Sequence, residues 1–211
     1  MRTKTLLLTA ALGVATAATT MAQVYSVNAV GYVNAPMAKG WNLIANPLQN
    51  QQDNTVKGLF GDLLPFGSVV YNWTGSTNDS AMYVGMWLPE DMTLLPGEGA
   101  FVFVPMDAAE APTVTFVGEV PQGTASNMQV AKDFALLGSK VPQAGKLSTD
   151  LKFPADFGDI VYTWTGATYD SYTYFGMWMP DEPTIAVGQG FWSYKPAAAV
   201  DWNRNFDINN P

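Results

Sequence analysis

The sequence predicts an all-β fold made of two tandem homologous antiparallel units, sandwich or jelly-roll-like, pseudo-symmetric and with little helix. The first observation is an internal repeat, because residues 66–105 align without a gap on residues 157–196 with 19 of 40 positions identical. The second is an apolar period of two, which is typical of strands. The third is that no amphipathic pattern of about ten residues or more predicts a helix; segments 53–64 and 129–137 are short and interrupted.

Each element of the repeated unit follows from local residue chemistry. Alternating apolar residues predict strands, Gly with Asp and Ser predicts a hairpin turn, and proline ends a strand because it removes a ladder donor. The expected elements are strands at 69–74 and 160–165, turns at 74–80 and 165–171, returning strands at 83–88 and 174–179, and last strands at 97–104 and 188–195. Further strands are expected at 29–33, 114–117 and 200–206, and an apolar run at 38–45 has a looser echo at 131–137, offset by 93 residues.

The alternation also predicts which side chains face the core. In the last strand of the second unit, Trp192 and Tyr194 alternate with Ser193 and Lys195. Because a serine and a lysine are expected on the wet side, the aromatic pair is predicted to point inward. By the same logic, Tyr71, Trp73, Phe101 and their copies are expected to fill the core.

The expected domain organisation is a signal peptide at 1–22, a first β unit at 23–122 and a second at 123–211. Arg2 and Lys4 precede the uncharged apolar run 6–18, and small residues lead to Ala22, a pattern typical of a secretory signal peptide. Each unit is expected either to form its own sandwich or small barrel, or to pack as one half of a single body. No Ser, Thr or Pro-rich linker separates them, which favours close packing.

Composition excludes several classes of function. The 211-residue chain has no Cys and no His, so disulfides, His- or Cys-ligated zinc and haem, and His-dependent catalytic triads are excluded. The formal net charge is −8, and removal of Arg2 and Lys4 leaves 8 basic against 18 acidic residues. This balance argues against nucleic acid and anionic membrane surfaces as partners. No integral membrane span is expected after signal cleavage, because no later run is apolar enough. No cofactor and no metal are expected.

Exposed aromatic side chains are the candidate ligand-binding residues. Trp and Tyr rings stack on sugar rings, and an exported acidic β protein is a plausible setting for carbohydrate binding. The candidates are Trp87 and Trp178, each beside a proline at a strand end, and Tyr169 and Tyr172 in the second hairpin loop. Core packing is the competing interpretation for Trp87 and Trp178.

Acidic residues suggest two further chemistries. Glu90 and Asp91 follow one Trp-x-Pro segment, and Asp181 and Glu182 follow the other. Paired carboxylates serve glycoside hydrolysis when they flank the scissile bond, but adjacent residues point to different sides, so solvated loop charges are the stronger interpretation. The turn segments Asp79-Ser80 and Asp170-Ser171 contain oxygen ligands suited to calcium, although a calcium-loop spacing is missing and turn formation explains them.

The chain resembles a group of uncharacterised secreted proteins from Verrucomicrobia-type bacteria. The similar motifs are the VYSVNAVGYVN start, the GWNLIANPL run and the repeated W-G...GMWxP...GxG-aromatic block, which together cover most of the chain after residue 22. The GWNLIANP and GxG-aromatic motifs are also similar to modules of large surface proteins of Bacteroidetes. The resemblance implies an exported β-rich module and no catalytic activity.

The expected function is that of a secreted, non-catalytic structural or interaction protein of the extracellular space or cell surface, assembling through exposed strand edges. Possible partners are polysaccharide and other surface proteins, and self-association is possible. The alternative is a glycan-binding module, and a carboxylate-dependent glycoside hydrolase is a weaker third hypothesis. The expected location is secreted, periplasmic or on the cell surface.

Overall fold

A computed structural model describes residues 29–50 and 52–210 of the chain. The prediction of an all-β fold is confirmed, because strands in antiparallel sheets make up almost all of its regular structure. The predicted signal peptide lies outside the described residues. Within the described part, no helix is long and apolar enough to cross a membrane. The division of the chain at residues 122 and 123 stays a prediction.

The first five-stranded sheet has the order β2-β6-β3-β4-β5, with every neighbouring pair antiparallel. A short helix, α2 (Val56–Phe60), lies between its first two strands in the sequence, in the segment 53–64. Its strands are β2 (Gly40–Ala45), β3 (Val69–Trp73), β4 (Asn78–Tyr83), β5 (Trp87–Leu88) and β6 (Gly99–Val104).

The second five-stranded sheet has the order β13-β12-β11-β15-β9, again antiparallel throughout. Its strands are β9 (Asp133–Gly138), β11 (Ile160–Trp164), β12 (Tyr169–Tyr174), β13 (Trp178–Met179) and β15 (Gly190–Lys195). The strand order is therefore the same in both sheets when β2, β3, β4, β5 and β6 are set against β9, β11, β12, β13 and β15.

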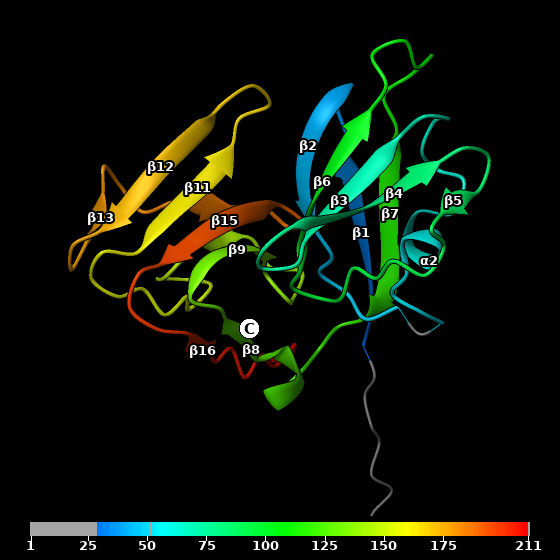
Figure 1. The fold of residues 1–211 in the computed structure, drawn as a ribbon. Coiled ribbons are helices and arrows are strands. Elements are labelled where there is room, and N and C mark those ends of the chain that lie inside the picture. The colour runs from blue at the N-terminus through cyan, green and yellow to red at the C-terminus, as the bar shows by residue number, and fades with distance from the viewer. Residues whose placement is uncertain (1–28, 51, 211) are drawn as a thin grey trace, which may run out of the picture.

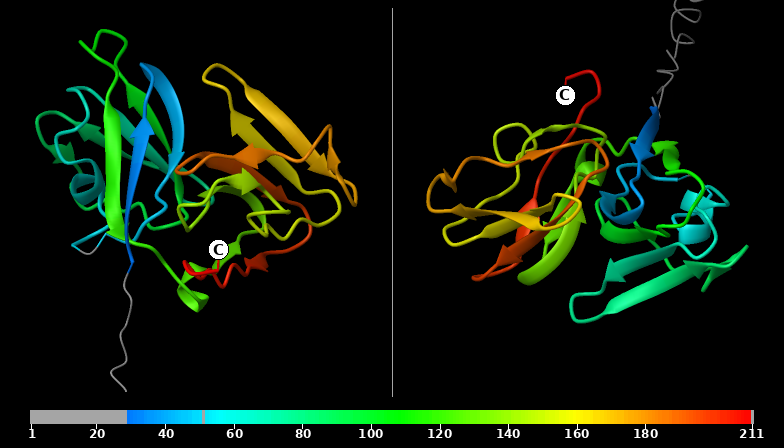
Figure 2. Two further views of the ribbon diagram at one scale, coloured as in Figure 1. Left: turned by 180° about the vertical axis from the view of Figure 1, so that it is seen from behind. Right: turned by 90° about the horizontal axis from the view of Figure 1, so that it is seen from above.

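Three two-stranded ribbons accompany the sheets. They pair β1 (Val30–Pro36) with β7 (Thr113–Glu119), β8 (Met128–Val130) with β16 (Val200–Trp202), and β10 (Gly145–Lys146) with β14 (Thr184–Ile185). A 3-10 turn, η1 (Thr124–Ser126), precedes β8. Figure 1 shows the two sheets side by side, with β8 and β16 below the second, and the view from behind in Figure 2 brings β1 and β7 to the front of the first.

Each sheet covers its own apolar core. The first core lies between the first sheet, α2 and the β1–β7 ribbon, and includes Phe60, Trp87 and Phe116. The second core includes Phe153, Phe191 and Trp202, the last of which comes from β16. Fully burying a large apolar side chain stabilises a fold by about 1.5–3 kcal/mol, so these two clusters are the main source of stability in a chain without cysteine.

The predicted inward orientation of the aromatic pair in β15 is wrong. Trp192 and Tyr194 are only half-buried, whereas Ser193 and Lys195 are 0% and 1% exposed. The same holds in β6, where Val102 faces the core while its aromatic neighbours lie on the opposite face. The core face carries Ala100, Val102 and Val104 in β6 and Phe191, Ser193 and Lys195 in β15, and the other aromatic side chains of these two strands lie on the face turned away from the core.

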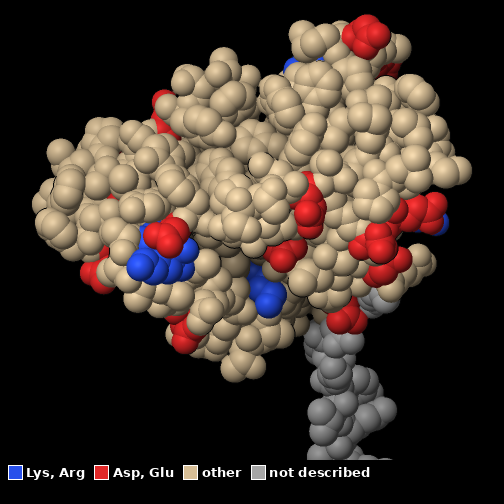
Figure 3. All heavy atoms as spheres, in the orientation of Figure 1, with Lys and Arg blue, Asp and Glu red and all other residues tan. Residues whose placement is uncertain are grey.

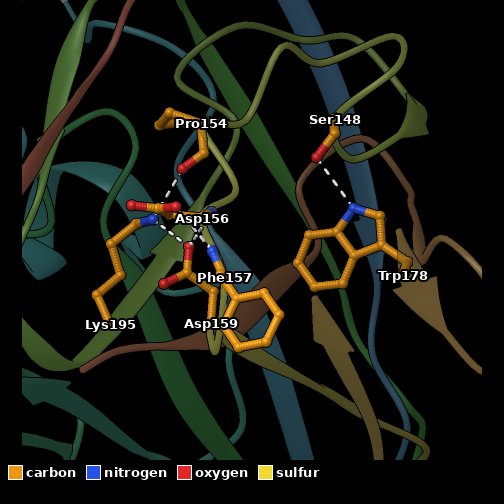
Figure 4. Close-up of polar contacts among 7 residues, drawn as sticks. All are labelled: Ser148, Pro154, Asp156, Phe157, Asp159, Trp178 and Lys195. Carbon is orange, nitrogen blue, oxygen red and sulfur yellow. Dashed lines mark hydrogen bonds and ion pairs between the residues drawn. The ribbon is translucent and has the colours of Figure 1, made fainter. Parts of the chain in front are cut away.

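Lys195 can face the core because its charge is paired there. Its Nζ forms an ion pair with the carboxylate of Asp159 and donates to the carbonyl oxygen of Pro154 at 2.8 Å (Figure 4). The ammonium also lies 5.1 Å from the ring centroid of Phe153. The backbone N–H of Asp156 donates to the same carboxylate at 2.8 Å. A buried charge is tolerated when it is paired and hydrogen-bonded, and these contacts meet that condition.

The two sheets meet through backbone hydrogen bonds that occur twice. The N–H of Ala45 donates to the carbonyl oxygen of Gly188 at 2.8 Å, and the N–H of Gly138 donates to that of Gly97 at 3.0 Å. Ala45 and Gly138 are 93 positions apart, and Gly97 and Gly188 are 91 apart, which are the two offsets of the sequence repeat. The contact is therefore reciprocal, in the manner of an isologous interface between two subunits, but within one chain.

Candidate functional site

The aromatic rows of the two sheets form a shared surface outside both cores. From the first sheet they contribute Trp41, Tyr71, Trp73, Phe101 and Phe103, and from the second Phe134, Tyr162, Trp164, Tyr169, Trp192 and Tyr194. All of these side chains are half-buried or exposed. These rings lie outside both cores but contact one another, so they are the strongest candidate for a binding site among the described residues. We call this surface the aromatic cleft.

A cavity of about 320 Å³ lies within the aromatic cleft. Five aromatic side chains line it, and no charged residue is among them. They come from β3, β9, β11, β12 and β15 of the two sheets, so both halves of the chain are needed to build it. The lining residues are Trp73, Phe134, Tyr162, Tyr169 and Trp192.

Reciprocal hydrogen bonds fix the tryptophans of the cleft. The indole N–H of Trp73, at the end of β3, donates to the carbonyl oxygen of Phe134 at 3.0 Å. The indole N–H of Trp164, at the end of β11, donates to the carbonyl oxygen of Trp41 at 3.0 Å. Each bond joins one sheet to the other, so the ring positions depend on the docking of the two halves.

Edge-to-face contacts between the rings follow the same reciprocity. Trp73 meets Trp192 at a centroid distance of 5.6 Å and 73°, and Trp164 meets Phe101 at 5.8 Å and 81°. Such pairs contribute about 0.5–1.5 kcal/mol beyond the area they bury. Because neighbouring rings are turned edge to face, the cleft has walls at several angles in place of one flat aromatic platform.

A more polar cavity of about 430 Å³ adjoins the first and shares Trp73 and Phe134 with it. Its polar lining includes Gln129, Lys140 and Glu98. Partial burial raises the pKa of Glu98, opposed by the hydrogen bond that its carboxylate accepts from the backbone N–H of Leu95 at 2.7 Å. A ligand that spans both cavities would meet aromatic faces in one and hydrogen-bonding groups in the other.

A third cavity, of about 400 Å³, is the counterpart of the polar one in the other half. It contains Trp164 and Trp41, and Gln189 occupies the place that Glu98 has in the first half. The side-chain oxygen of Gln189 accepts from the backbone N–H of Ala186 at 2.8 Å, the same local bond that Glu98 makes. The polar cavities therefore occur as a pair, one with a carboxylate and one with an amide.

Among the predicted site residues, only Tyr169 lies in the aromatic cleft. It is 41% exposed, and its ring centroid is 4.9 Å from that of Trp164. Tyr172 is half-buried and packs against the second core. Both tyrosines belong to strand β12, so their predicted place in a hairpin loop is wrong.

The prediction that Trp87 and Trp178 are exposed ligand-binding residues is wrong, because their side chains are buried, with exposed fractions of 1% and 7%. The indole N–H of Trp87 donates to the carbonyl oxygen of Gly61 at 2.8 Å, and that of Trp178 to the hydroxyl of Ser148 at 3.0 Å (Figure 4). Because β5 and β13 fold back on the hairpins, the tryptophans point under the sheet and leave their neighbours Leu88 and Met179 on the surface.

The carboxylates considered for hydrolysis have other partners. Glu90 forms an ion pair of 2.7 Å with Lys57. Glu182 accepts backbone hydrogen bonds of 2.6 Å from both Ser148 and Thr149. Burial alone would raise the pKa of Glu182, but these bonds outweigh it and lower the pKa. Glu90 and Glu182 thus both find partners within their own half, shortly after the outermost strands β5 and β13.

The described residues contain no cluster of three or more Asp and Glu side chains that could hold a metal ion. Asp79 and Asp170 lie on the exposed starts of β4 and β12. No known protein-family model, no curated protein and no solved structure matches the chain.

Sequence reasoning missed four of the five residues that line the aromatic cavity, namely Trp73, Phe134, Tyr162 and Trp192. Phe134 belongs to the looser echo of the Trp41 segment, and the alternation predicts the other three in the core. Two offsets in the sequence could have pointed to these residues. Trp41 and Phe134 are 93 positions apart and Trp73 and Trp164 are 91 apart, so each of these residues has an aromatic counterpart in the other half.

Proposed function

We propose that this chain is an exported, non-catalytic glycan-binding protein that holds a sugar chain in the aromatic cleft. The observation that carries the proposal is the cavity of about 320 Å³ lined by five aromatic side chains outside both cores, next to a polar cavity that shares two of them. The apolar faces of sugar rings stack on aromatic rings, and their hydroxyl groups need hydrogen-bonding partners nearby. The adjoining cavities supply both.

Charge and the disposition of the carboxylates support the same reading. The aromatic cavity has no charged lining residue, so it suits a neutral sugar better than an anionic one. Figure 3 shows an uncharged area in the upper middle of this face, while charged side chains lie below it and acidic side chains gather on the side of the first sheet. The carboxylates of Glu90 and Glu182 are engaged elsewhere, which favours binding without hydrolysis.

The export part of the proposal rests on Arg2, Lys4 and the apolar run 6–18. A chain that binds glycans without changing them would act outside the cell as an interaction protein. The proposal thereby joins the two functions that the sequence favours. N-terminal analysis of the protein recovered from its natural compartment checks the export step, with a mature N-terminus near residue 23 as the expected result.

The test of glycan binding is retention on insoluble polysaccharides, combined with affinity electrophoresis in soluble neutral glycans. Tyr169→Ala and Trp192→Ala are expected to weaken retention by about tenfold or more, since aromatic anchors at binding sites typically contribute over 1 kcal/mol. Tyr32→Ala is the matched control, because Tyr32 is an exposed strand tyrosine outside the cleft. Unchanged retention in both cleft variants, or no retention of the parent protein across a broad panel, would reject the proposal.

A further inference from the structure

Each sheet ends in an exposed apolar tip at its outermost strand. The first tip comprises Phe66, Val84, Met86 and Leu88, and the second comprises Phe157, Phe175, Met177 and Met179. All eight side chains are exposed, with Phe66 at 71% and Phe157 at 70%. No Asp, Glu, Lys or Arg belongs to either set.

A tight turn builds each tip. In the first, the N–H of Val84 donates to the carbonyl oxygen of Met86 at 2.9 Å, and Gly85 between them has a φ of +90°, which favours glycine. In the second, Phe175 and Met177 make the same bond at 2.9 Å. Each turn is flanked by a tyrosine and a buried tryptophan whose rings meet at a centroid distance of 5.3 Å, Tyr83 with Trp87 and Tyr174 with Trp178.

Core packing does not explain these residues. Phe66 and Phe157 are the same residue type at equivalent positions, as are Met86 and Met177, yet all four are more than half exposed. In the second tip the rings of Phe157 and Phe175 meet at a centroid distance of 5.3 Å, so these two exposed side chains form one surface. Contiguous exposed apolar patches on soluble proteins mark interaction sites.

The size of the tips indicates what covers them. The exposed fractions correspond to about 400–500 Å² of apolar surface per tip, near the usual size of the largest patch on a monomer. A stable interface buries about 800 Å² on each partner, so one tip suffices only for a weak contact. Strand addition is not the mode of contact, because β5 and β13 have two residues each and a proline follows both.

We propose that the tips bind tips of other copies of this chain, so that molecules join end to end into linear assemblies. A second copy is the partner that presents a surface of the same size and the same aromatic and methionine composition. Methionine side chains adapt to one another's shape, which suits contacts between two like tips as well as between the first tip and the second. Figures 1 and 2 place β5 and β13 at opposite ends of the molecule, so a chain that is bound at one tip leaves the other free to continue the assembly.

The test is analytical ultracentrifugation over a concentration series of the chain from residue 23, comparing the parent protein with charged tip variants. The parent is expected to form dimers and then longer species as its concentration rises. Met86→Glu and Met177→Glu each block one tip and are expected to stop assembly at the dimer. The double variant is expected to remain monomeric, and Met106→Glu, at an exposed methionine outside the tips, serves as the matched control.

The dependence of association on ionic strength distinguishes an apolar contact between tips from an electrostatic contact. The chains carry like net charge, and salt screens their repulsion, so tip association is expected to increase with ionic strength. A parent protein that stays monomeric at high concentration, or a double variant that assembles like the parent, would overturn the proposal. If the parent protein does not self-associate but sediments with phosphatidylcholine vesicles, the tips bind lipid and not a second copy. Glycan retention by the double variant keeps this test independent of the cleft.

Discussion

The indole N–H of Trp164 donates a hydrogen bond of 3.0 Å to the carbonyl oxygen of Trp41, across 123 residues of sequence. The equivalent bond joins Trp73 to Phe134 at the same distance. Each half donates one indole hydrogen bond to the other, as a two-fold symmetric interface requires. The residues that make these bonds belong to the aromatic cleft. The aromatic cleft therefore exists only when the two halves are docked.

The indole hydrogen bonds are expected to contribute separately to stability. Trp73→Phe and Trp164→Phe remove the N–H donor and keep an aromatic ring, so each is expected to cost about 1 kcal/mol, the net value of a typical hydrogen bond. Urea unfolding monitored by circular dichroism measures both. The double variant should lose close to the sum, and a double variant as stable as the parent would show that the bonds do not hold the halves together.

Gly190 is expected to tolerate no side chain, because an added Cβ would lie 2.5 Å from the backbone oxygen of Ile44 in the other half. Gly190→Ala should cost about 1–3 kcal/mol through overpacking. Gly31→Ala is the control, since its Cβ would meet only the side-chain ends of Leu48 and Val120, which can move. Urea midpoints of the two variants should differ, and equal midpoints would contradict the close approach at Gly190.

Glu98→Gln is expected to stabilise the protein at neutral pH. Burial raises the pKa of Glu98 in the folded state, so folding loses stability as pH rises from the unfolded value through the folded one, and the loss persists above it. The amide of Gln189 makes the equivalent hydrogen bond without that charge. The gain should disappear at a pH below the usual titration range of Glu, where the carboxyl is protonated in both states.

The reciprocal change supplies the control for Glu98. Gln189→Glu is expected to destabilise the protein at neutral pH and to have little effect at acidic pH, because it introduces the same half-buried charge in the other half. Urea midpoints at the two pH values measure both changes. Identical pH dependence of Glu98→Gln and the parent protein would show that Glu98 does not titrate abnormally.

Trp87→Ala is expected to cost about 3–5 kcal/mol, as for other large core residues. The ring is 1% exposed and meets Phe60 at a centroid distance of 5.8 Å and Tyr83 at 5.3 Å. Glycan retention by the fraction that remains folded should be unchanged, which is the opposite of the expectation for Tyr169→Ala. Loss of retention at normal stability would return Trp87 to the binding site.

Replacing both Lys195 and Asp159 is expected to leave the stability of the protein nearly unchanged, whereas replacing only one of them is expected to destabilise it. Lys195→Val alone leaves an uncompensated buried carboxylate and should cost about 3–5 kcal/mol. The first half of the chain has Val104 and Ser68 at the equivalent positions. The double variant Lys195→Val, Asp159→Ser takes that natural solution and should be close to the parent in stability. Strictly additive losses in urea unfolding would contradict the coupling.

The strands and hairpins were predictable from the sequence because their patterns are local. A period of two, Gly at the turns and proline at the strand ends predict the same elements in both halves, and β3, β6 and their copies formed there. The predicted returning strands 83–88 and 174–179 are wrong, because β4 (Asn78–Tyr83) and β12 (Tyr169–Tyr174) begin inside the predicted turns and a tight turn follows each of them. The repeat strengthened the prediction, since two variants of one unit reveal which positions tolerate change.

The orientation of the strands was not predictable, because it depends on partners far along the chain. A lysine in an alternating strand is usually on the solvent-exposed face, but Asp159, 36 residues before Lys195, is buried immediately before β11 and forms an ion pair with it. Aromatic rings are equally ambiguous, since they fill either a core or the contact between two halves. The cleft residues Trp73, Phe134, Tyr162 and Trp192 were missed for that reason.

The hydrogen bonds from Ala45 and Gly138 lie at the ends of β2 and β9, the inner edge strands of the two sheets. Each half thus shields a strand edge of the other, while the outer edges are only two residues long and are followed by proline. A chain divided between the halves would expose an open β edge beside a row of aromatic rings, a combination that promotes aggregation. Close docking of the halves is consequently also a protection against misassembly.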